Sequence, residues 1–445
     1  MKLLNNFTDN LSPTKKKVVS NIYWATTGKF VTMTGALFVG ILVARYLGPE
    51  KYGIMNYVIS YVAIFMVISN FGLDNIEIRE LSKNNENKNV ILGTSFRLRF
   101  VLAFIVYLLI LITTLVFESD LNTKIMILSY GLCVFVQPFN IIRNYFTSIV
   151  QNEYIVKSEI LRTILGGAIK ILLLLGNANL IWFVLAASFD FVLVSSGYFL
   201  AYTKKTGKLK SWFFDSAMAK YLLKESFPLL LSGAAIIVYQ QIDHVIIKNL
   251  IDNEALGYYA TANKFVNIFI FLPLIITQTL TPIIIRKKEK NINEYIRDRQ
   301  KMVNLILWSG IILAIFVSLT SYYVIIYSFG SEYEPAIPVL KVLSIKIVLM
   351  TLSFSTGQII IIEGLQKWAI FRDLIGGVVC VSFNILLIPH LGIIGAAYVS
   401  LITLVATNIL SCLVIKPYFF LLDIIWKSVI LGWKDVWYFK KYITQ

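Results

Sequence analysis

A series of long apolar segments separated by short polar stretches constrains this chain more than any other feature. A helix needs about 20 predominantly apolar residues to cross the hydrocarbon core of a bilayer. Only 15% of the 445 residues are charged, against about 25% in a soluble domain. The sequence therefore predicts an all-α polytopic membrane protein of about twelve transmembrane helices, near residues 19–46, 53–75, 94–117, 125–150, 156–176, 180–202, 226–250, 257–284, 303–328, 337–362, 369–388 and 393–415.

The basic residues predict the orientation of these helices. Lys and Arg concentrate in residues 15–17, 204–210 and 286–301, whereas the loops on the opposite side are short and tend to be acidic. Cytoplasmic loops of membrane proteins carry an excess of Lys and Arg, so we expect both termini in the cytoplasm and a bacterial inner-membrane, multi-pass location. The net charge of +16 then belongs to loops that face anionic lipid and predicts no nucleic-acid partner. The polar N-terminus does not resemble a cleavable signal peptide.

Two pairs of similar segments indicate an internal repeat. Glu50 and Gly53 recur as Glu254 and Gly257, in equivalent corners between apolar segments. "ILRTILGGAIK" at 160–170 likewise recurs as "IFRDLIGGVVC" at 370–380. Because six helices separate the copies, both halves enter the membrane from the same side, as in parallel-repeat transporters. We expect each glycine to allow a tight helix restart and each acid to cap the next helix.

This repeat divides the chain into two six-helix lobes around a central cavity. We predict an N-terminal lobe at 1–202, a basic cytoplasmic linker at 203–225, a C-terminal lobe at 226–415 and a tail at 416–445. The tail is aromatic and apolar but contains several charged residues, so we expect a helix in the membrane interface rather than a thirteenth span.

Ionisable residues inside the spans are the candidate functional residues, because burying a charge in a membrane is costly and usually serves function. Six cations and two acids qualify, and a cationic cavity suits a substrate that carries phosphate. His244 is added to these eight residues, because it follows Asp243 in the predicted span at 226–250. The set is Lys29, Arg143, Lys170, Asp190, Asp243, His244, Lys264, Lys341 and Lys346.

We predict substrate-binding roles for Lys29, Arg143, Lys264 and Lys346. Lys29 is the strongest candidate, because it lies about 11 residues inside the first segment, about 16 Å from its end and close to the midplane.

Asp243 and His244 are candidates for ion coupling or for a gate. Asp243 and Lys264 lie at matching depths on consecutive antiparallel helices, so they are also expected to be able to form a structural ion pair. Tyr239, Gln240 and Gln241 offer polar groups for sugar hydroxyls.

Signatures of enzymes are missing from the sequence. It has no nucleotide-binding GxxxxGK[ST] loop, no HExxH and no GxSxG. Its three cysteines all fall within apolar runs, where small buried hydrophobes are the usual role. We therefore predict no catalytic residue, no metal and no cofactor.

Three stretches resemble a known family: "NIYWATTGKF", "VARYLGPEKYGIMNYVISYVAIFMVISNFGLDNIEIRELSKN" and "IVYQQIDHVIIKNLIDNEALGYYATANKF". They are similar to the lipid-linked oligosaccharide (repeat-unit, Wzx-type) flippases of the multidrug/oligosaccharidyl-lipid/polysaccharide exporter (MOP) superfamily. The resemblance implies a two-lobed fold like that of the multidrug exporters (MATE-like) and a cationic lumen. It also implies flipping of undecaprenyl-diphosphate-linked oligosaccharide for O-antigen, capsule or exopolysaccharide synthesis. Asp243 and Lys264 match the family pattern in helices 7 and 8.

Two other functions remain open on the sequence. A multidrug exporter of the same superfamily would need an anionic cavity for cationic drugs. The six cations and two acids within the spans argue against such a cavity. A non-transporting component of a glycan-assembly complex would tolerate loss of Lys29. The expected partners are the lipid-linked substrate, membrane lipid, and the polymerase and chain-length proteins of the glycan pathway.

Overall fold

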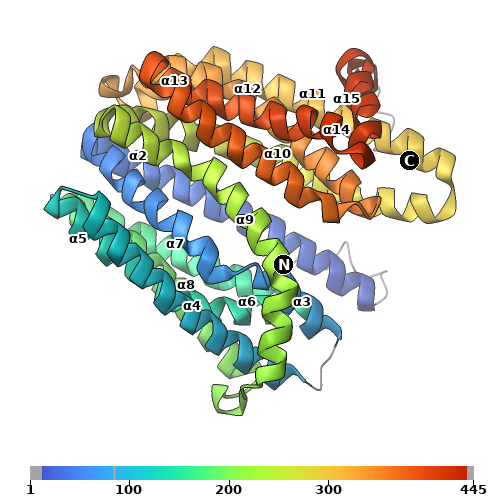
Figure 1. The fold of residues 1–445 in the computed structure, drawn as a ribbon, viewed down its shortest axis with the longest axis horizontal. Coiled ribbons are helices and arrows are strands. Elements are labelled where there is room, and N and C mark those ends of the chain that lie inside the picture. Colours follow the sequence, from blue (N-terminus) through green and yellow to red (C-terminus); the bar gives the residue numbers. More distant parts are fainter. Residues whose placement is uncertain (1–12, 84–86, 438–445) are drawn as a thin grey trace. The chain divides into compact units, whose positions relative to one another are not determined.

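The computed structural model describes residues 13–83 and 87–437, and all regular elements in these ranges are helical. Nine helical segments of this described part are long and apolar enough to cross a membrane. The predicted all-α polytopic fold is therefore confirmed (Figure 1). Its main helices are α2 (Pro13–Asn70), α3 (Leu73–Lys83), α4 (Lys88–Phe117), α5 (Leu121–Gly131), α6 (Asn140–Ser148), α7 (Asn152–Leu175), α8 (Leu180–Lys205), α9 (Ser216–Leu250), α10 (Asn253–Lys290), α11 (Ile292–Val324), α12 (Ala336–Ile362) and α13 (Ala369–Val405).

Two of the nine segments hold two predicted spans each. A non-helical glycine interrupts α2 at Gly48 and α13 at Gly392, and each break falls between two predicted spans. The predicted span at 156–176 coincides with α7, which is not among the nine. All twelve predicted segments are thus helical.

The chain divides into two compact units. The first comprises residues 1–46 and 58–234, and the second comprises 47–57 and 235–445. The boundary falls inside α9, and the short stretch 47–57 of α2 groups with the second unit. The two-lobe repeat and the linker at 203–225 stay predictions, and residues 1–12 of the predicted cytoplasmic N-terminus lie outside the described residues.

The predicted span at 125–150 is not one continuous helix. It consists of α5, a 3₁₀ segment η1 (Leu132–Phe139) and α6. Pro138 lies inside η1, and proline removes a backbone donor and clashes with the preceding helical turn. Hydropathy cannot register this break, because the 3₁₀ residues are as apolar as their neighbours.

The C-terminal tail packs as short helices against α11. η7 (Lys416–Tyr418) leads into α15 (Phe419–Leu431) and α16 (Trp433–Trp437). Gln300 of α11 donates hydrogen bonds to the Ile424 carbonyl (3.0 Å) and the Ser428 hydroxyl (2.8 Å) of α15. With 13 residues, α15 is too short to cross the core, so the described tail adds no thirteenth span.

The two repeated corners contact each other within the second unit. A Cβ added at Gly53 would collide with the backbone of Asn253, and one added at Gly257 would collide with the backbone of Pro49. At the repeat offset of 204 residues, Gly257 is equivalent to Gly53 and Asn253 is equivalent to Pro49, so the same contact is made in both directions. Two copies related by an approximate two-fold axis would make this reciprocal contact.

The corner residues differ from their predicted roles. Gly48, and not Gly53, has the left-handed φ of 71° that lets the helix restart, whereas Gly53 is needed for close approach. Asp252, and not Glu254, caps α10, because its carboxylate accepts a hydrogen bond from the Ala255 N–H at 2.7 Å. Glu254 instead accepts a hydrogen bond from the Tyr258 hydroxyl.

A charged cluster joins α10, α11 and the end of α12. Glu363 accepts hydrogen bonds from Lys288 (2.9 Å), Arg299 (3.2 Å) and the Tyr295 hydroxyl. Burial alone would raise the pKa of Glu363, but these bonds and charges outweigh it and hold that pKa below its ordinary value. The carboxylate therefore stabilises the fold above the unfolded pKa of about 4.3, and this contribution is lost as the pH falls through the lower folded pKa.

We accordingly expect Glu363→Gln to lower the melting temperature of the detergent-purified protein at pH 7. The variant should also lose less stability than wild type between pH 7 and pH 3.5. Glu289→Gln removes a neighbouring exposed acid and should follow the wild-type pH profile. Equal acid sensitivity of wild type and Glu363→Gln would contradict this account of the cluster.

Candidate functional site

A polar cluster in the second unit is centred on the buried carboxylate of Asp243. The Tyr259 hydroxyl donates a hydrogen bond to the Asp243 carboxylate and lies 3.0 Å from the Ser400 hydroxyl. The carboxylate also accepts a hydrogen bond from the backbone N–H of His244 at 3.0 Å. Asp243 is 3% exposed and Tyr259 is fully buried. The cluster therefore holds a carboxylate inside membrane-spanning helices mostly by neutral hydrogen-bond donors.

Lys346 of α12 brings a positive charge to this cluster. Its amine donates a hydrogen bond to the Asn263 side-chain oxygen at 2.9 Å and interacts electrostatically with Asp243. The His244 ring lies edge-on to Tyr259, with ring centroids 5.6 Å apart. The structure thus brings together three of the predicted residues, Asp243, His244 and Lys346.

Lys264 does not pair with Asp243, which corrects one sequence-based hypothesis. Its amine instead donates to the Tyr52 hydroxyl at 3.1 Å and lies 5.6 Å from the centre of that ring. Tyr259 and Asn263 are four residues apart on α10, so they share one face of that helix, and from it they contact Asp243 of α9 and Lys346 of α12. The residue after Asn263 points about 100° away around the helix, so Lys264 meets the stretch 47–57 instead.

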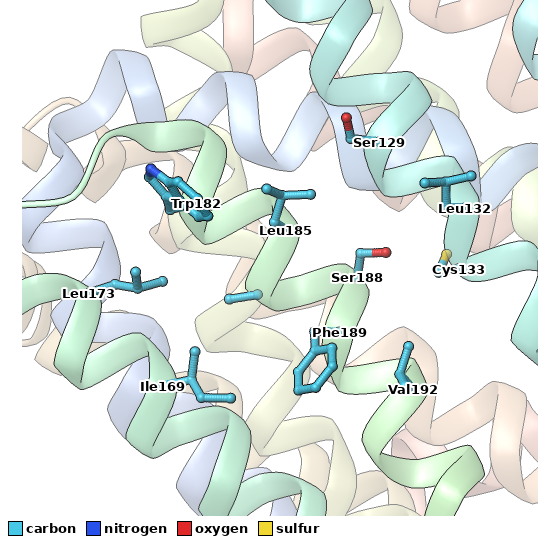
Figure 2. Close-up of a pocket in the computed structure, with 11 residues that line it drawn as sticks. Ser129, Leu132, Cys133, Ile169, Leu173, Trp182, Leu185, Ser188, Phe189 and Val192 are labelled. Carbon is cyan, nitrogen blue, oxygen red and sulfur yellow. The ribbon is translucent and has the colours of Figure 1, made fainter.

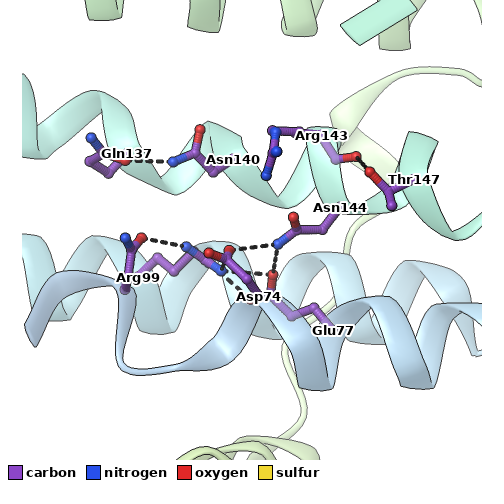
Figure 3. Close-up of polar contacts among 9 residues, drawn as sticks. Asp74, Glu77, Arg99, Gln137, Asn140, Arg143, Asn144 and Thr147 are labelled. Carbon is purple, nitrogen blue, oxygen red and sulfur yellow. Dashed lines mark hydrogen bonds and ion pairs between the residues drawn. The ribbon is translucent and has the colours of Figure 1, made fainter. Parts of the chain in front are cut away.

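Arg99 centres a second charged cluster, in the first unit (Figure 3). Its guanidinium donates to both Glu77 oxygens at 2.8 Å, to Asp74 at 2.7 Å and to Asn70 at 3.1 Å. Asn144 of α6 donates to Asp74 and Glu77 at 2.8 and 2.6 Å. Arg99 and Glu77 are fully buried, so the cluster ties the end of α2 and helices α3, α4 and α6 together.

Arg143 lies beside this cluster but remains accessible. Its side chain is 47% exposed, and its nearest carboxylate is Glu159 at 4.0 Å. Asn144, the next residue of α6, carries the contacts to the buried acids instead. The predicted substrate role of Arg143 stays a prediction.

Lys170 and Asp190 form an ion pair between α7 and α8. Both are only partly exposed, and the carboxylate packs against Gly166, where an added Cβ would collide with it. An apolar groove of about 430 Å³ lies next to this pair, lined by neighbouring residues that include Ile169 and Phe189 (Figure 2). The charge of Lys170 is therefore compensated, which indicates a structural role.

Lys29 has an exposed side chain, and no ion pair or side-chain hydrogen bond joins its amine to any described residue. The helix runs from Pro13 to the kink at Gly48, so Lys29 lies 18 residues before Leu47, or roughly 27 Å along the axis. The predicted midplane depth and substrate-binding role of Lys29 stay predictions.

Sequence reasoning missed the neutral members of these clusters. Tyr259, Asn263 and Ser400 carry no charge, and in-span hydroxyls and amides are too common to single out. Arg99 is absent from the predicted functional residues, although Asp74 and Glu77, three residues apart, are spaced for one helical face and offered a signal. Among residues 13–83 and 87–437, no three His, Cys, Asp or Glu side chains gather as a metal site would require.

The comparisons with known proteins point to one family. A family model described as polysaccharide biosynthesis protein matches residues 18–288, which is more than half of the chain. No curated protein matches the chain.

Several solved structures share the fold. An inward-facing multidrug resistance MATE family transporter of the MOP superfamily has a TM-score of 0.66 at 15% identity, covering 87% of this chain and 95% of its own. The lipid II flippase MurJ in an inward closed conformation has a TM-score of 0.69 at 16% identity, covering 94% and 92%. A MOP superfamily transporter from Pyrococcus furiosus has a TM-score of 0.58 at 15% identity, covering 96% of both chains. At such low identity these likenesses show the fold alone.

Proposed function

Because the chain belongs to the polysaccharide biosynthesis protein family, we propose that it flips undecaprenyl-diphosphate-linked oligosaccharide repeat units across the bacterial cytoplasmic membrane. The glycan would serve O-antigen, capsule or exopolysaccharide synthesis, and transport would follow alternating access. The MOP-type fold and the absence of catalytic motifs from the sequence support a transporter rather than an enzyme.

The observation that carries this proposal is the environment of Lys264. The Tyr52 hydroxyl, a neutral group, is the hydrogen-bond partner of its amine, whereas the amine of Lys170 has a carboxylate partner. A charge inside a membrane span is costly, and a positive charge without a carboxylate partner is available to an anionic ligand. Lys and Arg match phosphate in charge and in hydrogen-bond donors, so a lipid diphosphate fits this property better than a cationic drug.

The other predicted substrate residues extend this proposal. Lys346, held by the neutral Asn263 side chain, would add to the positive charge in the second unit. Lys29 and Arg143 are exposed cations of the first unit and would contact the diphosphate at other steps of transport.

Ligand-induced stabilisation of the detergent-purified protein tests the substrate class. A ligand at 100 times its dissociation constant stabilises the folded state by about 2.7 kcal/mol, so an undecaprenyl-diphosphate oligosaccharide should raise the melting temperature by several degrees. Lys264→Gln should reduce this shift, and Lys427→Gln, which removes an exposed tail lysine paired with Asp423, should preserve it. A shift produced by cationic drugs and not by the lipid diphosphate would favour a multidrug exporter.

Asp243 is proposed to couple transport to an ion gradient. Its carboxylate accepts hydrogen bonds from neutral donors and interacts with the Lys346 amine, so protonation or cation binding would change the local charge balance. We expect Asp243→Asn to fold but to make flipping in proteoliposomes insensitive to an imposed proton or sodium gradient. Ser353→Ala, a polar change on α12 whose hydroxyl bonds Asn408 instead, should keep the wild-type gradient response. An unchanged gradient response in Asp243→Asn would overturn the coupling role.

A further inference from the structure

A second groove lies at one end of the segment 366–414, which holds the last two predicted spans. It has a volume of about 700 Å³. One wall is the beginning of α13 and the other is the end of α14 (Ser411–Val414) with η7. The residues that matter here are Trp368, Phe371, Leu374, Val378, Val414 and Lys416.

The walls of this groove expose large apolar side chains. Phe371, Val378 and Val414 are 54%, 66% and 63% exposed, although they belong to a segment apolar enough to cross a membrane. In the bilayer no water is present to meet such side chains. The groove is therefore shaped for a lipid chain rather than for a polar solute.

The length of the groove matches one leaflet. Its lining on this side runs from Trp368, the residue just before α13, to Val379 of α13, which is about 16 Å at 1.5 Å per residue. The hydrocarbon core is about 30 Å thick, so the groove covers half of it. An acyl chain of a phospholipid fits this length, whereas a polyprenyl chain is longer than one leaflet.

The interfacial end of the groove is positively charged. Lys416 lines it, and the Lys367 amine lies 5.7 Å from the centre of the Trp368 ring. Both lysines are exposed, and neither forms an ion pair with a carboxylate of the described residues. Arg372 is already paired with Asp373 at 2.9 Å and does not contribute. Tryptophan is enriched at the level of lipid headgroups, which places this end at the membrane surface.

We infer that the groove binds one anionic phospholipid of the leaflet on this side. Its acyl chain lies along Phe371, Leu374 and Val378, and its phosphate contacts Lys416 and Lys367. This resident lipid is distinct from the transported substrate, so the site does not depend on the proposed function.

Native mass spectrometry of the full chain, titrated with defined lipids, tests this site. Wild type should retain one phosphatidylglycerol and retain phosphatidylethanolamine more weakly. A lysine near an anionic headgroup contributes about 1 kcal/mol, so Lys416→Ala should weaken phosphatidylglycerol binding about 5-fold and the double variant with Lys367→Ala about 30-fold. Val378→Trp, which fills the groove, should abolish retention of this one lipid.

Matched controls separate this site from general lipid contact. Leu319→Trp places the same bulk at a 75% exposed position on α11, and Lys434→Ala removes a lysine of α16, so both should bind phosphatidylglycerol as wild type does. Equal binding in wild type and in the Lys416 and Val378 variants would overturn the inference. So would retention of undecaprenyl phosphate in place of phosphatidylglycerol, because the occupant would then be the carrier lipid.

Discussion

Arg99→Met is expected to destabilise the first unit by about 3 to 5 kcal/mol, the cost of breaking a buried ion pair by removing one partner. Arg99 and Glu77 are both fully buried, and the guanidinium holds both oxygens of Glu77 and one of Asp74. Methionine would leave Glu77 as a buried charge whose remaining side-chain hydrogen-bond donor among the described residues is the Asn144 amide. The loss is measured as the fall in melting temperature of the purified protein.

The neighbouring Arg97 is the matched control. It is exposed, and its guanidinium lies 5.5 Å from the centre of the Phe214 ring, so Arg97→Met should cost about 1 kcal/mol or less. Adding Glu77→Leu to Arg99→Met should recover much of the lost stability, because an apolar replacement of a whole buried pair is often neutral. A double variant no more stable than Arg99→Met would show that the charge of Glu77 is not the source of the loss.

Gly257→Ala is expected to cost about 3 kcal/mol, at the upper end of the usual range for overpacking. The added Cβ would meet the backbone of Pro49, and a backbone cannot rotate away as a side chain can. Gly53→Ala should have a similar effect, because its Cβ would meet the Asn253 backbone. Both losses are measured as a fall in melting temperature.

Gly357 in α12 provides the comparison for the corner glycines. A Cβ there meets nothing within 4 Å, and alanine is the better helix former. Gly357→Ala should therefore leave the stability unchanged or raise it by up to about 1 kcal/mol. If Gly257→Ala were as stable as Gly357→Ala, the two corners would not be in close contact.

The sequence predicts the fold well because the hydropathy of each span is summed over about 20 residues. The twelve apolar segments all correspond to helices, and no helix in the described part of the tail is long enough to be a candidate span. The break at Pro138 and the early start of α2 were missed. Both depend on backbone geometry and helix ends, to which hydropathy is insensitive.

The candidate site is predictable in its charged residues but not in their partners. Asp243 and Lys264 are predicted to lie at similar depths, yet depth says nothing about the direction in which a side chain points around its helix. A helix that is apolar on all sides has no distinct hydrophobic stripe, so its sequence does not show which side chains face the neighbouring helices. The roles of Gly53 and Gly257 were missed for a related reason, because close approach depends on a partner 200 or more residues away.

Flipping in proteoliposomes tests the central claim most directly. A labelled undecaprenyl-diphosphate oligosaccharide is incorporated with the purified protein, and an impermeant glycosidase reports its exposure. Wild type and Lys427→Gln should expose the glycan at similar rates above protein-free liposomes, whereas folded Lys264→Gln should be at least about 10-fold slower, the equivalent of 1.4 kcal/mol. No exposure above protein-free liposomes, with a native glycan and an imposed gradient supplied, would contradict the flippase account.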